Sequence, residues 1–161
     1  INCTYVLINA ISFIMNRVTK VLLGANGLLA NGYVASTIGS SQIALVAKSF
    51  NVPVVVCCET YKFCDKVQTD AFINNELGDP NDLLNVPKSF GTQKSPLDDQ
   101  RDKKSSDAVN LLNLTYDITA PEFIACVVTD MGTLPCTSVP VVLRLKNRAP
   151  KITGNKASSL Y

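Results

Sequence analysis

The chain has 161 residues, of which 47% are hydrophobic and 17% are charged. A compact fold of this length buries roughly 70% of the surface of its unfolded chain, so we expect one domain with a substantial core and exclude a largely disordered chain. The net charge of +2 excludes the basic footprint of a direct nucleic-acid binder. A mean hydropathy of +0.18 is high for a soluble monomer and favours a surface covered by another chain.

No apolar run reaches the ~18 residues that a membrane span needs, so no membrane partner is expected. The start lacks an initiating Met and the basic region of a signal peptide, and we therefore expect a piece of a longer protein. The cysteines show no CxxC spacing, and the adjacent pair Cys57 and Cys58 has poor geometry for a disulfide framework. These features predict a cytoplasmic protein.

The first part of the chain predicts a strand, a loop, a helix and a second strand. Residues 5–15 are apolar nearly all round, which favours a helix buried in the domain or in an interface. Residues 18–23 and 52–58 have the composition of buried strands. Between them, Ser40 or Ser41 is a suitable cap for a helix. This order is typical of a parallel sheet with a right-handed crossover.

The middle of the chain is interrupted by a polar insertion at about 78–107. It carries three prolines followed by a mixed-charge run without periodicity. Order resumes over 109–117, and Pro121 begins a short turn that leads into a predicted strand at 124–129.

The last part of the chain predicts one more helix. Ser138 followed by Pro140 indicates a helix start, so we expect a terminal helix over 138–145. Residues 148–161 are polar and form a tail, which leaves one domain over 1–147.

The absence of His excludes Ser-His-Asp, Cys-His and HExxH chemistry together with the usual zinc sites, so no metal is expected. Glycines cluster between Gly24 and Gly39, but their spacing fits neither a P-loop nor a GxGxxG motif. Two interpretations stay open. The glycines shape the turns beside a strand, or Gly39, Ser40 and Ser41 hold a small anion at a helix N-terminus.

Chemistry-bearing residues also follow the second predicted strand. Cys57, Cys58 and Glu59 lie at its carboxyl end, with Lys62 three residues further on. Lys62 could activate a nucleophilic cysteine there. The alternative is an inert cysteine buried in a Val-rich strand.

Carboxylates at three further places have structural explanations. Asp98 and Asp99 lie among Lys and Arg in the insertion, where a solvated run is the better account. Asp117 and Asp130 each end an apolar segment, which favours a capping or turn role.

Several long stretches of the chain are similar to one known family. They are LLGANGLLANGYVASTIGSSQIALVAKSFNVPVVVCCETYKF (22–63), NELGDP (75–80), LLNLTYDITAPEFI (111–124), VVTDMG (127–132) and SVPVVLR (138–144). They resemble the regulatory subunits of eukaryotic translation initiation factor 2B, a family that includes methylthioribose-1-phosphate isomerase and ribose-1,5-bisphosphate isomerase. CTYVLINA, VCCETYKF and SVPVVLR are most similar to the delta branch.

The resemblance implies an α/β fold, a Rossmann-like three-layer domain with a mostly parallel sheet flanked by helices. It also bears on catalysis. The isomerases carry a catalytic Asp in a GAD triplet, and the corresponding residues here are Gly24, Ala25 and Asn26. Their Asn-Lys pair corresponds to Ser36 and Thr37. The resemblance therefore implies a chain without isomerase activity and without a cofactor.

The function implied is regulatory, in the guanine-nucleotide exchange factor for translation initiation factor 2. The expected partners are the other subunits of factor 2B, with the beta subunit first, and initiation factor 2, chiefly its alpha subunit, whose phosphorylation the complex senses. The alternative is a sugar-phosphate isomerase or sugar-phosphate sensor of the same fold.

Two groups of residues are candidates for these roles. A vestigial ligand crevice is expected to be lined by Asn26, Asn31, Gly32, Gly39, Ser40, Glu59 and Lys62. An interface with other subunits is expected to include Tyr5, Ile8, Ile11, Leu112, Leu114 and Tyr116.

Overall fold

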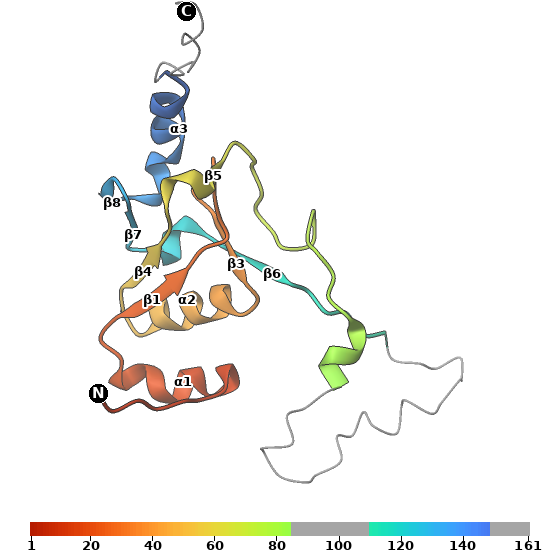
Figure 1. The fold of residues 1–161 in the computed structure, drawn as a ribbon. Coiled ribbons are helices and arrows are strands. Elements are labelled where there is room, and N and C mark those ends of the chain that lie inside the picture. Colours follow the sequence, from red (N-terminus) through yellow and green to blue (C-terminus); the bar gives the residue numbers. More distant parts are fainter. Residues whose placement is uncertain (85–109, 149–161) are drawn as a thin grey trace, which may run out of the picture.

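The computed structural model describes residues 1–84 and 110–148, and these form two sheets with helices around them (Figure 1). The strands are β1 (Val21–Gly24), β2 (Gly27–Leu29), β3 (Val34–Thr37), β4 (Val54–Cys57), β5 (Phe63–Cys64), β6 (Tyr116–Thr119), β7 (Cys126–Thr129) and β8 (Gly132–Leu134). The α-helices are α1 (Ile11–Ile14), α2 (Ser40–Ser49) and α3 (Val139–Arg148). Short 3₁₀ turns occupy Ile8–Ala10, Met15–Arg17, Thr60–Lys62, Pro80–Leu84, Pro121–Phe123 and Cys136–Ser138.

The first sheet has the order β1-β4-β7-β8. Strands β1, β4 and β7 are parallel, and β8 returns antiparallel to β7. The connection from β1 to β4 runs through the β2 and β3 strands and then through α2, so the predicted helix between two parallel strands and the α/β fold class are confirmed. On the sheet face that carries them, Leu22 and Val128 are 70% and 41% exposed, so the described residues cover that face only in part.

The second sheet has the order β5-β2-β3-β6, and its strands β2 and β3 lie in the glycine-rich stretch that was predicted to be a loop. Strands β2 and β3 form an antiparallel hairpin through Asn31 and Gly32. The N–H of Gly32 donates to the carbonyl of Leu29 at 2.8 Å, and the positive φ of Gly32, 84°, suits the turn. Strands of three or four residues are too short to show the alternation of apolar and polar side chains that marks a strand in the sequence. The prediction of a plain loop between Gly24 and Gly39 was wrong for this reason.

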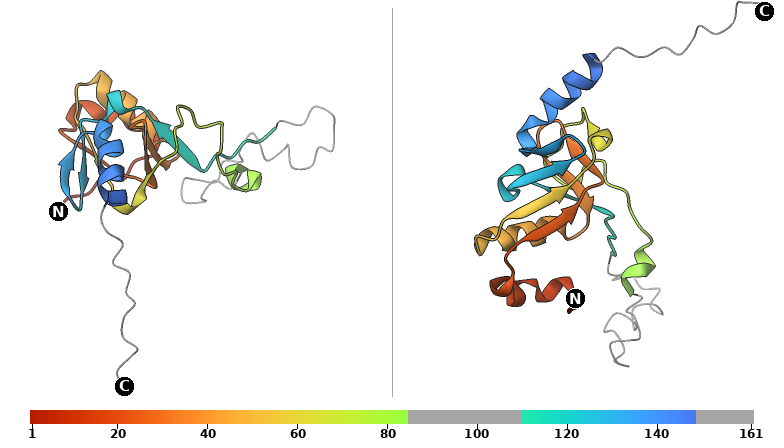
Figure 2. Two further views of the ribbon diagram at one scale, coloured as in Figure 1. Left: turned by 90° about the horizontal axis from the view of Figure 1, so that it is seen from above. Right: turned by 60° about the vertical axis from the view of Figure 1, so that its left-hand side comes forward.

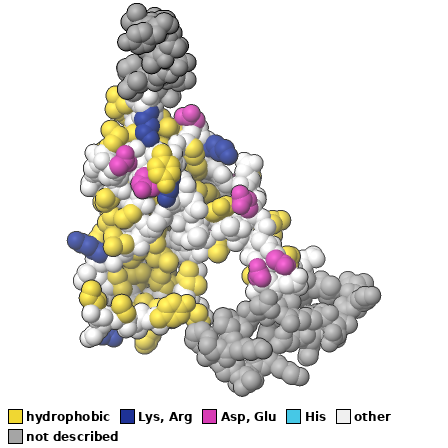
Figure 3. All heavy atoms as spheres, viewed as in Figure 1, with side chains coloured by type: hydrophobic (Ala, Val, Ile, Leu, Met, Phe, Trp, Pro, Cys, Tyr) yellow, Lys and Arg dark blue, Asp and Glu magenta, His cyan; other side chains and the backbone are white. Residues whose placement is uncertain are grey.

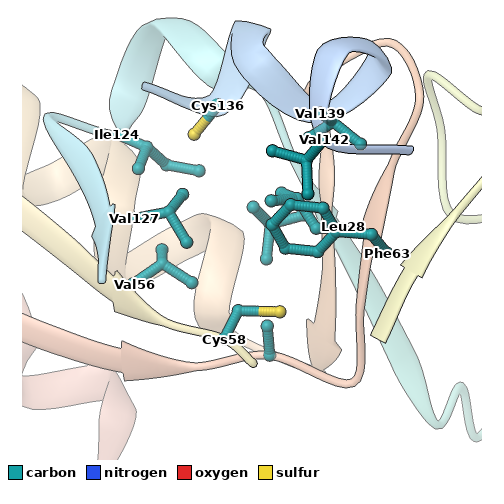
Figure 4. Packing of buried hydrophobic residues seen from close by; sticks show 11 residues of the cluster. Leu28, Val56, Cys58, Phe63, Ile124, Val127, Cys136, Val139 and Val142 are labelled. Carbon is teal, nitrogen blue, oxygen red and sulfur yellow. The ribbon is translucent and has the colours of Figure 1, made fainter. Parts of the chain in front are cut away.

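The main core lies between the two sheets, under the start of α3 (Figure 4). Val56 and Val127 of the first sheet point toward Leu28 and Phe63 of the second. A smaller core around Met15 fills the space between the N-terminal helical segment, α2 and the first sheet. The two cores pack α2 and the second sheet against one face of the first sheet.

The N-terminal helix is shorter and more exposed than predicted. It begins at Ile8, and among its residues only Met15 is buried, while Phe13 is 83% exposed. A position deep inside the domain is therefore wrong for the described residues. Helix α3 starts directly after Ser138 as expected but continues to Arg148. Most of the predicted insertion (85–107) and the tail (149–161) lie outside the described residues.

A pair of glycines gives a matched test of this packing. Gly39 and Gly132 both have positive φ, 94° and 109°, but an added Cβ would overlap the side chain of Ile8 only at Gly39. Strain at positive φ costs about 1–2 kcal/mol for an L-residue. We expect Gly39→Ala to lower the free energy of unfolding by more than Gly132→Ala, as measured by urea unfolding. Equal losses would show that Ile8 does not pack tightly on Gly39.

Candidate functional site

The candidate crevice is built at the carboxyl ends of β1 and β4, which end side by side with Gly24 opposite Cys57. The chain turns away there through Asn26 after β1 and Glu59 after β4. Lys62 Nζ donates to the carbonyl of Ala25 at 3.2 Å and lies 3.8 Å from Glu59 Oε2. The structure therefore brings Asn26, Glu59 and Lys62 to one corner, as the strand–helix–strand order predicts.

Two buried hydroxyl groups lie behind this corner. Ser36 Oγ donates to the carbonyl of Gly24 at 2.9 Å. Ser40 Oγ donates to the carbonyl of Thr37 at 2.7 Å and lies 3.1 Å from Ser36 Oγ. Both serines are at most 5% exposed. Their hydroxyl groups bind the backbone and hold β3 and α2 against the end of β1.

The predicted anion position at the start of α2 already has an acceptor. The carboxylate of Asp117 accepts hydrogen bonds from the N–H groups of Gly39 and Ser41 at 3.1 and 2.9 Å. Asp117 therefore has the expected capping role, but it caps α2, whose residue Ser41 lies 76 residues earlier in the chain. Gly39, not Ser40 or Ser41, is the capping residue of α2, and it has a left-handed conformation.

Two of the predicted crevice residues lie elsewhere. Asn31 and Gly32 form the turn of the β2–β3 hairpin, whereas Asn26 lies at its open end. Asn31 Nδ2 donates to the carbonyl of Gln68 at 2.9 Å, and Gly32 packs on the backbone of Cys136. These residues stabilise the hairpin and do not join the corner at Asn26.

A cavity of about 280 Å³ opens beside the second sheet. Its lining residues are Asn26, Gly27, Leu29, Ala35, Cys64, Lys66, Gln68, Asn74, Asn75, Glu76, Tyr116 and Ile118. Asn26 is the one member of the predicted crevice in this lining. The polar residues after β5 were missed because no period or motif marks them. The nearest signal was the NELGDP segment, which begins at Asn75.

The two cysteines after β4 differ in environment. Cys57 is exposed, whereas Cys58 is 3% exposed and its Sγ lies 3.6 Å from the carbonyl of Glu59. Burial raises the pKa of the Cys58 thiol, and the opposing charge of Lys62 is the smaller effect. A raised pKa disfavours the thiolate, so the structure favours the inert interpretation of Cys58.

Asp130 has the expected turn role, because it joins the β7–β8 turn to the turn after β4. Its Oδ1 accepts the N–H of Thr60 at 2.7 Å, and its Oδ2 accepts the Thr60 hydroxyl at 2.9 Å. The backbone N–H and then the hydroxyl of Thr60 hold the pKa of Asp130 below its ordinary value of 3.8. Because the folded pKa is the lower one, this stabilisation is complete above the unfolded pKa and is lost as the pH falls through the folded pKa.

We therefore expect Asp130→Asn to lower the free energy of unfolding at neutral pH. The difference from the unsubstituted chain should shrink once the pH falls below about 4. Urea unfolding at a series of pH values measures it. A difference that stays constant into acid would contradict the role of the Asp130 carboxylate.

The predicted interface residues fall into two groups, one on the N-terminal segment and one around β6 (Figure 1); hydrophobic side chains gather on the face of the molecule drawn in Figure 3. Tyr5 and Ile8 belong to the N-terminal segment and are 87% and 43% exposed, whereas Ile11 is half-buried. Leu112 is 55% exposed and lies just before β6, on which Tyr116 is half-buried. Leu114 is also half-buried and bridges to Leu77. Strand β6 leads away from the first sheet, so this second group lies on an extended part of the molecule (Figure 2).

The described residues lack two further features, a metal-binding cluster and a membrane-spanning helix. Across 1–84 and 110–148, no group of three or more Cys, Asp or Glu side chains could hold a metal ion. No helix within those ranges is long and apolar enough to cross a membrane.

The fold and the corner at Asn26 define a class of protein. It is an α/β domain with parallel strands whose carboxyl-edge corner is lined by an amide and by hydroxyl groups bonded to the backbone. The chain belongs to the Initiation factor 2 subunit family, whose profile matches residues 1–136.

Curated relatives place the chain further within this family. It is 46% identical over 145 residues to a protein named translation initiation factor eIF2B subunit delta from Dictyostelium discoideum, and 42% identical over 143 residues to the one from Schizosaccharomyces pombe. Each match covers 89% of this chain but only 23% and 30% of those relatives. The delta-branch resemblance is thereby confirmed. A ribose 1,5-bisphosphate isomerase from Pyrococcus furiosus is 32% identical over 81% of this chain and 36% of the isomerase.

Solved structures confirm the fold. A 5-methylthioribose 1-phosphate isomerase from Pyrococcus horikoshii aligns with a TM-score of 0.70 at 21% identity, over 90% of this chain and 38% of the isomerase. An eIF-2B subunit delta from A. fulgidus aligns with a TM-score of 0.69 at 24% identity, over 89% of this chain and 39% of that one. At these identities the likeness concerns the fold alone.

Proposed function

We propose that this chain is part of a regulatory, non-catalytic subunit, of the delta type, in the guanine-nucleotide exchange factor for translation initiation factor 2. The observation that carries the proposal is the similarity to proteins named eIF2B subunit delta over 89% of this chain. Because the chain spans at most 30% of those relatives, the activity of the whole protein is part of the proposal.

The proposed partners are the other subunits of factor 2B, with the beta subunit first, and initiation factor 2 through its alpha subunit. Exposed apolar side chains such as Tyr5 and Leu112 support burial against other chains. Regulation would act by differential binding, because one arrangement of the subunits accepts initiation factor 2 productively and another is favoured by its phosphorylated form. Such a complex works in the cytoplasm.

The proposal that the chain is not an enzyme rests on the corner of the crevice. By the family resemblance, Asn26 takes the position of the isomerases' catalytic acid, and an amide neither donates nor takes up a proton near neutral pH. By the same resemblance, Ser36 and Thr37 take the positions of the isomerases' Asn and Lys, so a cation for a phosphate is missing there. The Ser36 hydroxyl binds the carbonyl of Gly24.

Affinity capture of the full-length protein from native cytosolic extract tests the proposed function. We expect the other four subunits of factor 2B in near-equal amounts, identified by mass spectrometry. Recovery of the protein alone, or only with further copies of itself, would refute it.

A sugar-phosphate sensor of the same fold is the second candidate. The cavity of about 280 Å³ that includes Asn26 favours it, together with the relative named ribose 1,5-bisphosphate isomerase. This candidate predicts binding without turnover.

A further inference from the structure

The start of α2 is bound by a side chain from a distant strand. Asp117 Oδ2 accepts the N–H groups of Gly39 and Ser41 at 3.1 and 2.9 Å, and Asp117 Oδ1 accepts the N–H of Ile118 at 3.0 Å. The first turn of α2 has no acidic residue of its own, and Gly39 has no side chain to cap it. A carboxylate from β6 therefore supplies the negative charge at this helix end.

The position of this carboxylate follows from the elementary properties of helices. The first N–H groups of a helix have no partner within the helix and carry partial positive charge, so an anion is favoured there. In many proteins the anion is a ligand phosphate. Here the N–H groups that would bind a ligand are already bound to Asp117.

The same carboxylate connects β6 to the rest of the domain. Asp117 lies opposite Ser36 in the β3–β6 pairing, and β3 leads through the turn at Gly39 directly into α2. The N–H of Ile38 continues the ladder by donating to the carbonyl of Thr115 at 3.2 Å. On the other side of β6, Asn75 binds both backbone groups of Tyr116, at 3.0 and 2.7 Å.

We propose that Asp117 is a positioning residue whose carboxylate acts as an internal anion at the start of α2 and fixes β6, which begins at Tyr116 two residues after Leu114, against the domain. A free phosphate does not bind at this helix end while Asp117 occupies it. The part of the proposal that concerns a partner subunit rests on the proposed function. The part that concerns the anion rests on the hydrogen bonds of Asp117 alone.

Replacement of the missing carboxylate by a small free anion tests the proposal on the full-length protein. Asp117→Ala removes the carboxylate and leaves space for formate. We expect a lower Tm for this variant and a recovery of Tm in about 0.1 M sodium formate, whereas the same concentration of sodium chloride, which screens charges equally, gives none. The unsubstituted protein should not respond to formate beyond its response to chloride.

Asp130→Ala is the matched control. Asp130 likewise accepts hydrogen bonds, but its two come from Thr60 in a short 3₁₀ turn and not from the start of an α-helix. We expect this variant to lose stability without recovery in formate. An equal response of Asp117→Ala and the unsubstituted protein to formate would overturn the internal-anion role.

A second variant keeps the test valid if Asp117→Ala does not fold. Asp117→Asn preserves the shape of the side chain but removes its charge. We expect amide hydrogen exchange to become several-fold faster at Gly39 and Ser41 and to stay unchanged at Thr60. Exchange at Gly39 and Ser41 that matches the unsubstituted protein would overturn the proposal.

The positioning role of Asp117 is tested by measuring how well the full-length protein captures the beta subunit. We expect Asp117→Ala to weaken capture of the beta subunit and formate to restore it. Recovery of Tm without any change in capture would overturn the positioning role. If the unsubstituted protein captures no beta subunit at all, the proposed function fails, and the Tm and exchange measurements still decide the role of the Asp117 carboxylate.

Discussion

Replacement of Leu112 by Asp is expected to abolish capture of the beta subunit by the full-length protein. The Leu112 side chain is 55% exposed on the segment that leads into β6, and the proposed interface would bury it. An unpaired carboxylate buried at an apolar interface costs on the order of 3–5 kcal/mol. This cost corresponds to roughly a 10²- to 10⁴-fold loss of affinity.

Leu45→Asp provides the control, because Leu45 is 54% exposed and lies on α2, outside the proposed interface. Co-expression with the beta subunit, followed by measurement of the dissociation constant, compares the two variants at nearly equal exposure. Leu45→Asp should pair like the unsubstituted protein. If both variants pair normally, the interface does not include the segment before β6.

The full-length protein is expected to give no measurable turnover of ribose 1,5-bisphosphate. General acid–base catalysis contributes about 10²–10⁴-fold to a rate, and the amide of Asn26 cannot supply it. The isomerase from Pyrococcus furiosus serves as the positive control in the same assay. Asn26→Asp alone is expected to stay inactive, because the family resemblance also assigns Ser36 and Thr37 to the positions of the isomerases' Asn and Lys. Turnover by the unsubstituted protein would refute a purely regulatory role.

Binding without turnover would instead favour the sensor. A ligand at about one hundred times its dissociation constant stabilises the native state by about 2.7 kcal/mol. Under the regulatory proposal, ribose 1,5-bisphosphate should leave Tm unchanged. Stabilisation that is lost in Asn26→Ala but kept in Asn16→Ala, a substitution at an exposed position outside the cavity, would locate the ligand in the cavity beside the second sheet.

The parts of the fold that could be predicted are those with local signals. Strand β4 and helix α2 carry their own apolar patterns, so their order predicted the parallel sheet correctly. Strands β2, β5 and β8 have only two or three residues each, and they exist because neighbouring strands complete their hydrogen bonds. A segment of that length has no detectable period.

For the candidate site, too, the sequence predicted one part and the tertiary structure decided the other. The sequence by itself determined the chemistry available: no His, an amide at Asn26, and hydroxyl side chains at Ser36 and Thr37. It also brought Asn26, Glu59 and Lys62 to one corner, because the carboxyl ends of parallel strands meet at one edge of a sheet.

Only the tertiary structure decided that Asn31 stays apart from this corner and that Asp117 meets the start of α2. Asn31 and Asn26 are close in the chain but lie at opposite ends of a hairpin. Asn26 precedes the first strand of the hairpin, whereas Asn31 lies in the turn at the other end of that strand. Asp117 is 76 residues from Ser41, yet its carboxylate binds the start of α2. A pairing of strands far apart in the chain created that contact, and no local pattern of residues encodes it.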